Sequence, residues 1–428
     1  MSERLIPFLD PWTTPAFLWL LIVGAGVLVG LRGRRLSILS AAGAVSIAIW
    51  KAWAIGPPNG LLDLSIYTGS ARAWLDGASL FSYHSPVFNL SATYPPIGVI
   101  PFSLLTSLPV AVREVLFTIL SLGAIAIGAR CAAVLAGIGR DRRTQWMLWA
   151  ISLSIVTIPV WLTLRQGQVN ALLWALVLGD IVLMSRGSRF AGIPIGIATA
   201  VKLVPGLFIV WMVLASRRRP AVRSICTAVA LTASGWALAP VDSKAYWTDL
   251  LWHSERVGRL DDARNNSMLG TLAHVLEPGT VRTVVWLTLA LTLLVVGMRR
   301  AVIASRRNDL LTAAVITGCL SALVSPISWT HHLGYLVLGL AALHPLTQGS
   351  RRGRVLFVVV CVAVIDPGHL GDDAFMSFVR MMLMVAVVLA MPIVTDRSTE
   401  GPITADDGNG SAAPTQAART PRMRSTNS

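Results

Sequence analysis

Asp63 stands just beyond an apolar run and opens a stretch with apolar or aromatic residues at Leu64, Tyr67, Ala71 and Trp74. That helical spacing predicts an amphipathic helix lying on a membrane surface. Asp63 either caps this helix, since Asp is a favoured N-cap residue, or presents a reactive carboxylate to a cavity. Residue preference alone favours the cap, and both interpretations are kept.

Lys202 interrupts a second apolar run, in the string ATAVKLVP that ends at Pro205. A lysine at membrane depth is costly unless it is paired or faces a cavity, so it marks a functional site by default. Snorkelling of its ammonium group to the interface is the alternative, although the break at Pro205 argues against it. The pattern therefore favours a lysine in a cavity.

Two adjacent histidines, His331 and His332, begin a later apolar run in the string SPISWTHH. Neighbouring helical positions point about 100° apart, so the two rings cannot readily share one metal ion. One histidine facing a cavity is suited to bind a proton or a phosphate, and the other to pack structurally. The sequence has no cluster with the spacing of a zinc site, so no metal is predicted.

Two further segments are rich in polar groups. The string RQGQVN at 165–170 holds Gln168 and Asn170, whose amides suit a polyhydroxy ligand and a structural turn equally well. A later segment holds Arg256, Arg264 and Asn266 beside tryptophans that are typical of a membrane interface. We expect most of these residues to be structural and one or two arginines to bind a ligand phosphate.

The elements that must position these residues are those of a membrane protein. Of 428 residues, 54% are hydrophobic and only 13% charged, and the mean hydropathy is +0.66. Soluble proteins carry roughly twice that charged share, about 25%. The net charge of +15 would suggest a nucleic-acid partner in a soluble domain, but here it is attributed to cytoplasmic loops. The four cysteines lie in apolar runs without CxxC spacing, so no disulfide is predicted.

The apolar runs predict an all-α polytopic membrane protein. The segments predicted to cross are 16–31, 36–56, 112–137, 145–164, 168–184, 221–240, 281–298, 308–325, 329–346, 354–366 and 374–395. Two further runs are broken by prolines or by Lys202. We expect 94–108 not to cross and 190–215 to enter and return on the cytoplasmic side, where protein or a cavity surrounds the irregular backbone.

Charge sets the predicted topology. Six connections between apolar runs hold 19 basic residues, with only Asp141 and Asp309 as acids in or beside them. The positive-inside rule places all six in the cytoplasm, which leaves 57–93, 241–280 and the turn 366–373 outside. This arrangement has an outside N-terminus and an inside C-terminus. Residues 1–395 are predicted to form one transmembrane domain, and the polar stretch 396–428 a disordered cytoplasmic tail.

Together these motifs resemble the GT-C superfamily of polyprenol-phosphate-dependent glycosyltransferases. An Asp with a Tyr four residues on, Asp63 and Tyr67, precedes the string TYPP, which contains Tyr94. GQVN at 167–170, VKLVP at 201–205, NS at 266–267 and SPISWTHH at 325–332 narrow the resemblance. They are similar to glycosyltransferase family 87, the actinobacterial α-(1→2)-mannosyltransferases of phosphatidylinositol mannoside and lipoarabinomannan assembly. The resemblance covers about residues 57–345, and it departs in having two apolar segments before Asp63 rather than one.

The resemblance implies a GT-C fold of about 11–13 transmembrane or re-entrant helices with external amphipathic helices, in the plasma membrane. It implies an active site on the extracytoplasmic face, where mannose passes with inversion from polyprenyl-phosphate-mannose to a mannosylated lipid or lipoglycan. The partners implied are membrane lipids, this donor and a glycolipid acceptor, with no nucleic acid and no obligate protein partner. Neither a cofactor nor a metal is expected.

The same resemblance assigns roles to the candidate residues. Asp63 matches the family's early aspartate, which would deprotonate the acceptor hydroxyl. Donor-phosphate contacts, needed as negative charge grows on the leaving group, are expected from His331 or His332 first and then from Lys202, Arg256 and Arg264. Sugar or acceptor contacts are expected from Tyr67, Tyr94, Gln168, Asn170, Asn266 and Trp329. The segments 94–108 and 190–215 are expected to line the donor groove.

Three competing functions are kept beside this one. The first is an arabinofuranosyltransferase that uses decaprenyl-phosphoarabinose, because a sugar pocket cannot be derived from sequence. The second is a lipid or sugar transporter, although transporters often contain inverted repeats and this sequence has no evident repeat. The third is a noncatalytic scaffold, which the presence of Asp63 and both histidines disfavours.

Overall fold

The computed structural model describes residues 15–54, 60–86, 88–347, 351–365 and 374–394. Over these ranges every regular element is a helix, and the one β-bridge, between Asn265 and Trp329, stands outside any strand. The all-α fold predicted from the apolar runs is therefore confirmed. The predicted turn at 366–373 and the predicted tail at 396–428 lie outside the described residues.

Each segment predicted to cross contains a helix. In chain order these are α1 (Pro15–Leu28), α2 (Gly33–Ala54), α5 (Val110–Leu135), α6 (Arg140–Ile155) with α7 (Ile158–Gln166), α8 (Asn170–Ser185), α11 (Arg218–Leu238), α14 (Thr280–Arg306), α15 (Leu310–Val324), α16 (Gly334–Thr347), α17 (Arg351–Ile365) and α18 (Ala374–Ala390). Among the described residues, three helices are long and apolar enough to cross a membrane, namely α5, α11 and α14, and α6 with α7 is a bent fourth candidate. The number of crossings remains a prediction.

The segment 145–164, predicted as one crossing helix, is bent. Helices α6 and α7 meet at 73°, and Pro159 lies in the first turn of α7. Thr157, just before α7, is extended with φ −81° and ψ +145°, and Pro159 fits the first turn of α7 because its missing N–H would have no partner within the helix there. The bend ends α6 at Ile155, and α7 packs against α3 (Leu62–Leu75).

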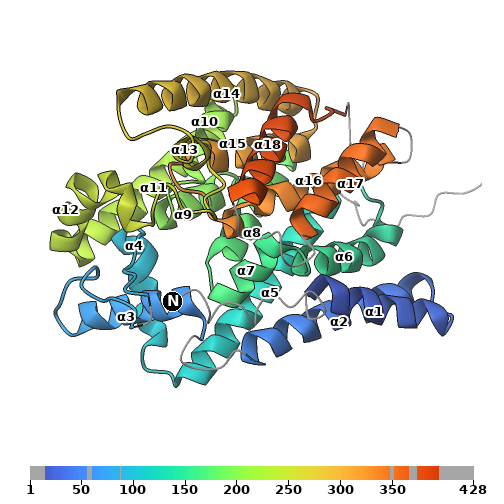
Figure 1. Ribbon diagram of the computed structural model, residues 1–428, viewed down its shortest axis with the longest axis horizontal. Helices are drawn as coiled ribbons and strands as arrows, with labels where there is room; N and C mark the ends of the chain where they lie inside the picture. The colour runs from blue at the N-terminus through green and yellow to red at the C-terminus, as the bar shows by residue number, and fades with distance from the viewer. Residues whose placement is uncertain (1–14, 55–59, 87, 348–350, 366–373, 395–428) are drawn as a thin grey trace, which may run out of the picture.

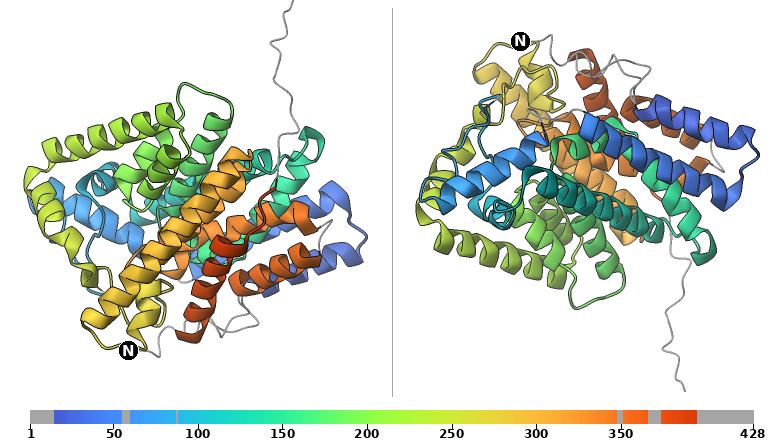
Figure 2. Two further views of the ribbon diagram at one scale, coloured as in Figure 1. Left: turned by 90° about the horizontal axis from the view of Figure 1, so that it is seen from above. Right: turned by 90° about the horizontal axis from the view of Figure 1, so that it is seen from below.

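Helix α15 is the centre of the bundle. All its residues from Leu310 to Leu323 are buried, and it packs against α14, α16 and α18. Helix α14 instead exposes apolar side chains such as Val281, Leu291 and Val295, which is typical of a surface that faces lipid. Figures 1 and 2 show α14 along an outer edge of the bundle and the pair α1–α2 at the opposite edge.

The two segments predicted to be broken are broken. They fold as α4 (Pro96–Val99) with η3 (Ile100–Leu105), and as α9 (Ile193–Val201) with α10 (Gly206–Leu214). A Cβ on Gly98 would lie 2.5 Å from the Val201 carbonyl oxygen, so glycine lets α4 approach the end of α9 closely. Lys202, which follows α9 in extended backbone, is thereby brought next to the segment that carries Tyr94.

The predicted amphipathic helix is α3, and its apolar face is covered by protein. Leu64, Tyr67 and Ala71 are buried, and Trp74 is partly buried. This face packs against η3, α4 and α7, so protein covers it, and the position of the helix at a membrane surface stays a prediction. The helical spacing was identified correctly, but spacing does not distinguish a lipid partner from a protein partner.

The two segments predicted to lie outside, 57–93 and 241–280, are called the first and second outer segments. The second folds as α12 (Pro240–Thr248), η4 (Leu250–Trp252), η5 (Ser254–Arg256) and α13 (Met268–Ala273). It is joined to the first outer segment by side chains. Ser79 Oγ donates to Asp242 Oδ1 at 2.5 Å, and Arg256 Nη2 donates to the Ala92 carbonyl oxygen at 2.9 Å. The two outer segments therefore form one connected layer.

Candidate active site

Asp63 lies in the first turn of α3 and does not cap it. The N-cap residue is Leu61, and no side chain caps the helix. Asp63 Oδ2 instead accepts a hydrogen bond of 2.7 Å from Gln168 Nε2, and part of the Asp63 side chain is exposed. The cap interpretation is therefore wrong, because the helix begins two residues earlier than expected and the carboxylate faces another element.

Gln168 reaches Asp63 because α7 ends in a tight turn at Gly167. Gly167 is the C-cap of α7 with φ +68° and ψ +40°, a left-handed conformation that glycine adopts without strain. A Cβ there would lie 2.8 Å from Leu61 Cβ and 2.9 Å from Leu64 Cβ. Glycine at 167 thus permits both the turn and the contact between α7 and the start of α3.

Two charged residues hold the backbone just before Asp63. The Leu61 N–H donates to Glu114 Oε1 at 3.2 Å, and Arg165 Nη1 donates to the Gly60 carbonyl oxygen at 2.9 Å. Neither residue was among the predicted site residues. Both could have been recognised in the sequence. Glu114 is an acid at the start of an apolar run, and Arg165 belongs to the polar string at 165–170.

Tyr67 and Tyr94 meet at the carbonyl end of Gln168. Gln168 Oε1 accepts from the Tyr94 hydroxyl at 2.9 Å and from the Tyr67 hydroxyl at 3.1 Å. The two rings are stacked, with centroids 5.3 Å apart. Both ends of the Gln168 amide are therefore used inside the protein, although a sugar contact was expected of it.

Lys202 is buried and has three polar neighbours. Its Nζ lies 3.0 Å from Asn170 Oδ1, 3.3 Å from the Tyr94 hydroxyl and 3.1 Å from His332 Nε2. Asn170 Nδ2 donates to the carbonyl oxygen of His331 at 2.9 Å. The lysine thus lies within protein as expected. We call Asp63, Tyr67, Tyr94, Gln168, Asn170, Lys202 and His332 the buried polar group; five of the seven are buried, and Asp63 and His332 are partly exposed.

The two histidines differ in their surroundings. They belong to the short helix η6 (Thr330–His332), and their rings stand at 90°. His332 Nδ1 accepts from the backbone N–H of Trp329 at 3.2 Å. The tautomer that this bond favours carries its hydrogen on Nε2, the atom beside Lys202. His331 Nε2 is buried and has no hydrogen-bond partner among the described residues.

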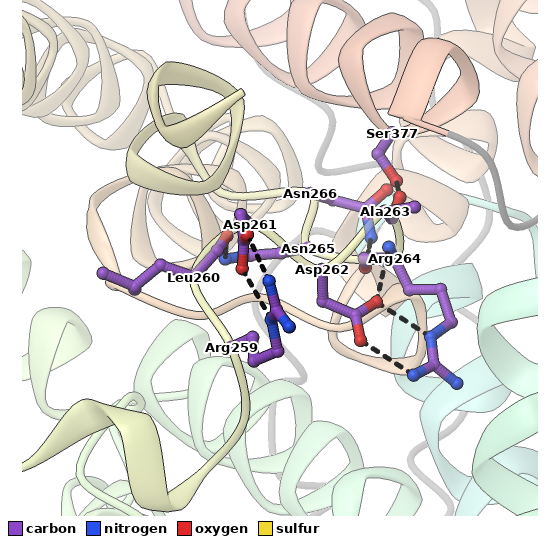
Figure 3. A network of polar contacts seen from close by, with 9 residues as sticks. All are labelled: Arg259, Leu260, Asp261, Asp262, Ala263, Arg264, Asn265, Asn266 and Ser377. Atoms are coloured by element: carbon purple, nitrogen blue, oxygen red, sulfur yellow. Dashed lines mark hydrogen bonds and ion pairs between the residues drawn. The ribbon is translucent and has the colours of Figure 1, made fainter. Parts of the chain in front are cut away.

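The outer arginines and Trp329 do not join the buried polar group. Arg256 donates to the carbonyl oxygens of Leu250 and Ala92. Arg264 pairs with Asp262, as Figure 3 shows, and its guanidinium lies over the Trp329 ring at 5.7 Å. These contacts give both arginines structural partners in the outer layer.

Asn266 is the third amide expected to contact sugar. Its Nδ2 lies within hydrogen-bond distance of the Arg264 and Ser328 carbonyl oxygens and of Thr330 Oγ1. Its Oδ1 is buried without a partner among the described residues. Of the three amide side chains predicted to contact sugar, Asn266 is the one whose oxygen has no hydrogen-bond partner among the described residues.

One cavity is lined by members of the buried polar group, and a larger one shares lining residues with it but contains no member of the group. The smaller, about 40 Å³, is lined by Lys202, His332 and Ser328 among others, and Ser328 Oγ has no partner among the described residues. The larger, about 470 Å³, is apolar and is bounded mainly by α5, α6, α8, α16 and α17. Trp174 and Tyr335 line both. The 190–215 break lines the smaller cavity as expected, whereas 94–108 lines neither.

Burial controls the charge of the carboxylate. Removal from water raises the pKa of Asp63 to about 6, while the hydrogen bond from Gln168 and the charge of Lys202 oppose the rise. Burial also raises the pKa of Tyr67 well above its ordinary value. A carboxylate with a pKa near neutrality, partly exposed and fixed by a hydrogen bond, can accept a proton from a hydroxyl placed beside it.

No metal cluster is evident in the described ranges: no three His, Cys, Asp or Glu side chains there gather closely enough to hold an ion. The two histidines lie next to each other, but no carboxylate or thiolate among the described residues is close enough to complete a metal site with them. The arrangement suits proton transfer and anion binding by side chains.

The fold and the site define a class: an all-α polytopic membrane protein whose polar side chains gather beside an apolar cavity. A model of glycosyltransferase family 87 matches residues 92–326, more than half of the chain, and the chain belongs to this family. It is therefore a glycosyltransferase, as the sequence motifs predicted.

Named relatives agree with this family. The polyprenol-phosphate-mannose-dependent α-(1-2)-phosphatidylinositol mannoside mannosyltransferase of Mycobacterium tuberculosis is 29% identical over 323 residues, 71% of this chain and 74% of the relative. The corresponding phosphatidylinositol pentamannoside mannosyltransferase of Mycolicibacterium smegmatis is 30% identical over 321 residues, 73% of this chain and 77% of the relative. No solved structure matches the chain.

Proposed function

We propose that this protein transfers mannose from polyprenyl-phosphate-mannose to a phosphatidylinositol mannoside or related lipoglycan, with inversion and an α-(1→2) linkage. The donor and the acceptor class are those in the names of both relatives described above. One structural observation supports the assignment above all: a partly exposed carboxylate and a buried cation stand in one hydrogen-bonded group next to an apolar cavity. Transfer from an anionic lipid needs each of these three parts.

Asp63 is the general base in this proposal. It removes the proton of the acceptor hydroxyl as that oxygen attacks the anomeric carbon, and the bond from that carbon to the phosphate oxygen breaks. A positioned base contributes typically about 10²–10⁴-fold, and alignment of the two substrates supplies much of the remainder. The contact with Gln168 supports this role because it fixes the carboxylate. Glu114 and Arg165 hold the backbone of Leu61 and Gly60, just before Asp63.

Lys202 and His332 bind the donor phosphate in this proposal. The Nε2–H of His332 and the Lys202 ammonium group lie 3.1 Å apart, and two donors at this distance favour an anionic oxygen that accepts from both. Negative charge grows on this oxygen as polyprenyl phosphate leaves, so the two donors stabilise the transition state. Of the two histidines, His332 is preferred because it lines the small cavity with Lys202.

The larger cavity is proposed to hold the isoprenoid chain of the donor. Its lining is almost wholly apolar, and it adjoins the small cavity at Trp174 and Tyr335. A lipid chain there would place its phosphate next to Lys202 and His332. We further propose that the site opens on the extracytoplasmic face, since the arginine-rich connections belong in the cytoplasm by the positive-inside rule.

The assay that tests this function uses purified protein in detergent with EDTA present throughout. One arm supplies polyprenyl-phosphomannose with a phosphatidylinositol mannoside acceptor, and the other supplies polyprenyl-phosphoarabinose. We expect α-(1→2)-linked mannose in the first arm and none in the second. The reaction proceeds without a divalent metal, because a monophosphate donor needs less charge neutralisation than a pyrophosphate donor.

Each alternative has its own result in this assay. Transfer confined to the arabinose arm would contradict the sugar, and activity restored only by excess Mg²⁺ or Mn²⁺ would contradict the metal-free mechanism. A transporter would give no transfer in either arm, and vesicles that contain the protein would then move the donor from one side of their membrane to the other.

A further inference from the structure

Gln168 lies in the middle of a directed chain of hydrogen bonds. Lys202 Nζ donates to the Tyr94 hydroxyl at 3.3 Å, and that hydroxyl donates to Gln168 Oε1 at 2.9 Å. Gln168 Nε2 then donates to Asp63 Oδ2 at 2.7 Å. Every donor points from the cation toward the carboxylate, so the charge on Lys202 strengthens each bond in the chain.

The tyrosines determine which way the Gln168 amide faces. The hydroxyls of Tyr67 and Tyr94 both lie within hydrogen-bond distance of Oε1, while the Tyr94 oxygen accepts from Lys202. Reversing the amide would set its oxygen against the Asp63 carboxylate and lose the hydrogen bond from Tyr94. The amide is therefore held with its NH₂ toward Asp63, and Tyr94 transmits the orientation imposed by Lys202.

We propose that Gln168 and Tyr94 are positioning residues that couple the base to the donor, so that a phosphate at Lys202 makes Asp63 a stronger base. This inference rests on the function proposed above. An anion at Lys202 offsets its positive charge and accepts hydrogens that Lys202 otherwise gives to Tyr94. Tyr94 and then Gln168 donate less strongly, and Asp63 holds a proton more tightly.

The ionisable groups around Asp63 come from every element packed near it. They are Tyr67 in α3, Tyr94 before α4, Glu114 in α5, Arg165 in α7, Lys202 after α9, and His331 and His332 in η6. Glu114 and Arg165 contact the backbone at Leu61 and Gly60 rather than the carboxylate. Lys202 is the cation whose charge acts on Asp63, which makes it the point through which a bound anion would act.

The test compares two pH profiles of mannose transfer by the full-length protein. The kcat/KM for the donor reports the free enzyme, and the kcat/KM for the acceptor at saturating donor reports the donor complex. We expect the midpoint of the acid limb to be about half to one pH unit higher in the donor complex, as for loss of a nearby opposite charge. In Tyr94→Phe, which removes one oxygen and keeps the ring, we expect this difference to be smaller than in the wild type, because the part carried by Tyr94 and Gln168 is lost while the direct effect of the Lys202 charge remains. A difference equal to that of the wild type would overturn the role of Tyr94.

Gln168→Glu supplies a second readout. It keeps an oxygen for the tyrosines but replaces the NH₂ donor with a second carboxyl group, so we expect the free-enzyme midpoint to rise by about one unit or more. The matched control is Gln166→Glu, the same change two residues earlier, where the side-chain oxygen has no partner among the described residues. The control should keep both wild-type midpoints.

The possible failures are distinguishable. Equal midpoints for the free enzyme and the donor complex of the wild type would overturn the coupling. A Gln168→Glu variant that is slower by the same factor at every pH would reduce Gln168 to a packing role. Absence of mannose transfer by the wild type, or a profile with no acid limb, would contradict the proposed function itself. If Gln168→Glu does not fold, Tyr94→Phe alone decides the coupling.

Discussion

The buried polar group and the charged segment 249–264 contain similar residue types. They differ in how far apart in the chain the paired side chains lie. In the outer segment, Arg259 pairs with Asp261 at 2.6 Å and Arg264 with Asp262 at 2.8 Å, each two residues away in the chain. Figure 3 shows both pairs within one loop. In the buried polar group, Gln168 meets Asp63 across 105 residues and Lys202 meets His332 across 130.

This difference separates a site from a solvated surface. A pair two residues apart forms in almost any loop and contributes little, about 0–1 kcal/mol when it is exposed. A buried group built from distant segments exists only in the complete fold, and each unpaired member would cost the fold desolvation energy. The residues in the distant arrangement are therefore the ones expected to act on substrate.

The largest effect is expected for Asp63→Asn. The amide has the size of the carboxylate but cannot accept the acceptor's proton, so kcat should fall by about 10²–10⁴-fold. Transfer rates and donor binding of the purified variant test this, with an unchanged melting temperature as the control. Transfer within about tenfold of the wild type would remove Asp63 as the base.

A smaller loss is expected for Lys202→Met. The substitution keeps an unbranched apolar stem but removes the charge beside His332, so kcat/KM for the donor should fall by about 10²-fold. Lys244→Met, on the exposed surface of α12, is the matched control and should match the wild type. Unchanged kinetics in Lys202→Met would return Lys202 to a structural role.

A several-fold effect is expected for Gly128→Leu. A side chain at Gly128 on α5 enters the larger cavity, where a Cβ meets only Leu178 at 3.7 Å. Its KM should rise for a long isoprenoid donor and stay unchanged for a short-chain donor. Gly123→Leu is the control on the same helix, since Gly123 is exposed and a Cβ there meets nothing within 4 Å. Equal KM changes for both donors would place the lipid elsewhere.

The smallest effect is expected in the outer segment. Arg259→Gln and Arg264→Gln each break an exposed or partly exposed pair, so transfer rates should stay within about twofold and the melting temperatures should match that of the wild type. Donor titrations and thermal unfolding of each variant measure this. A tenfold rise in KM for either one would show that an outer arginine binds the phosphate, and the comparison between the two regions would fail.

Much of the fold was accessible from the sequence because apolar length and charge are local properties. Each predicted crossing segment contains a helix, and the breaks near Pro95 and Lys202 occur where the pattern is interrupted. The bend before α7 was missed because the apolar run continues through Pro159 without a charged residue. Hydropathy indicates that a segment is buried in lipid or protein, but it does not indicate where the helix axis changes direction.

The site was accessible in part. Asp63 and Lys202 stood out as charges beside or within apolar runs, and the structure brings them into one group. The partners of Gln168 could not be predicted, since its three contacts come from segments far away in the chain. An amide in a turn looks the same in sequence whether it faces a sugar or a carboxylate.

The pH dependence of transfer tests the role of Asp63 most directly. Its pKa is raised to about 6 by burial, and a general base acts only when it is ionised. We therefore expect kcat/KM for the donor, measured from pH 4.5 to 8.5, to be level above about pH 7. Below about pH 6 it should fall about tenfold for each pH unit. A rate that stays level across this range, or that rises as the pH falls, would contradict Asp63 as the base.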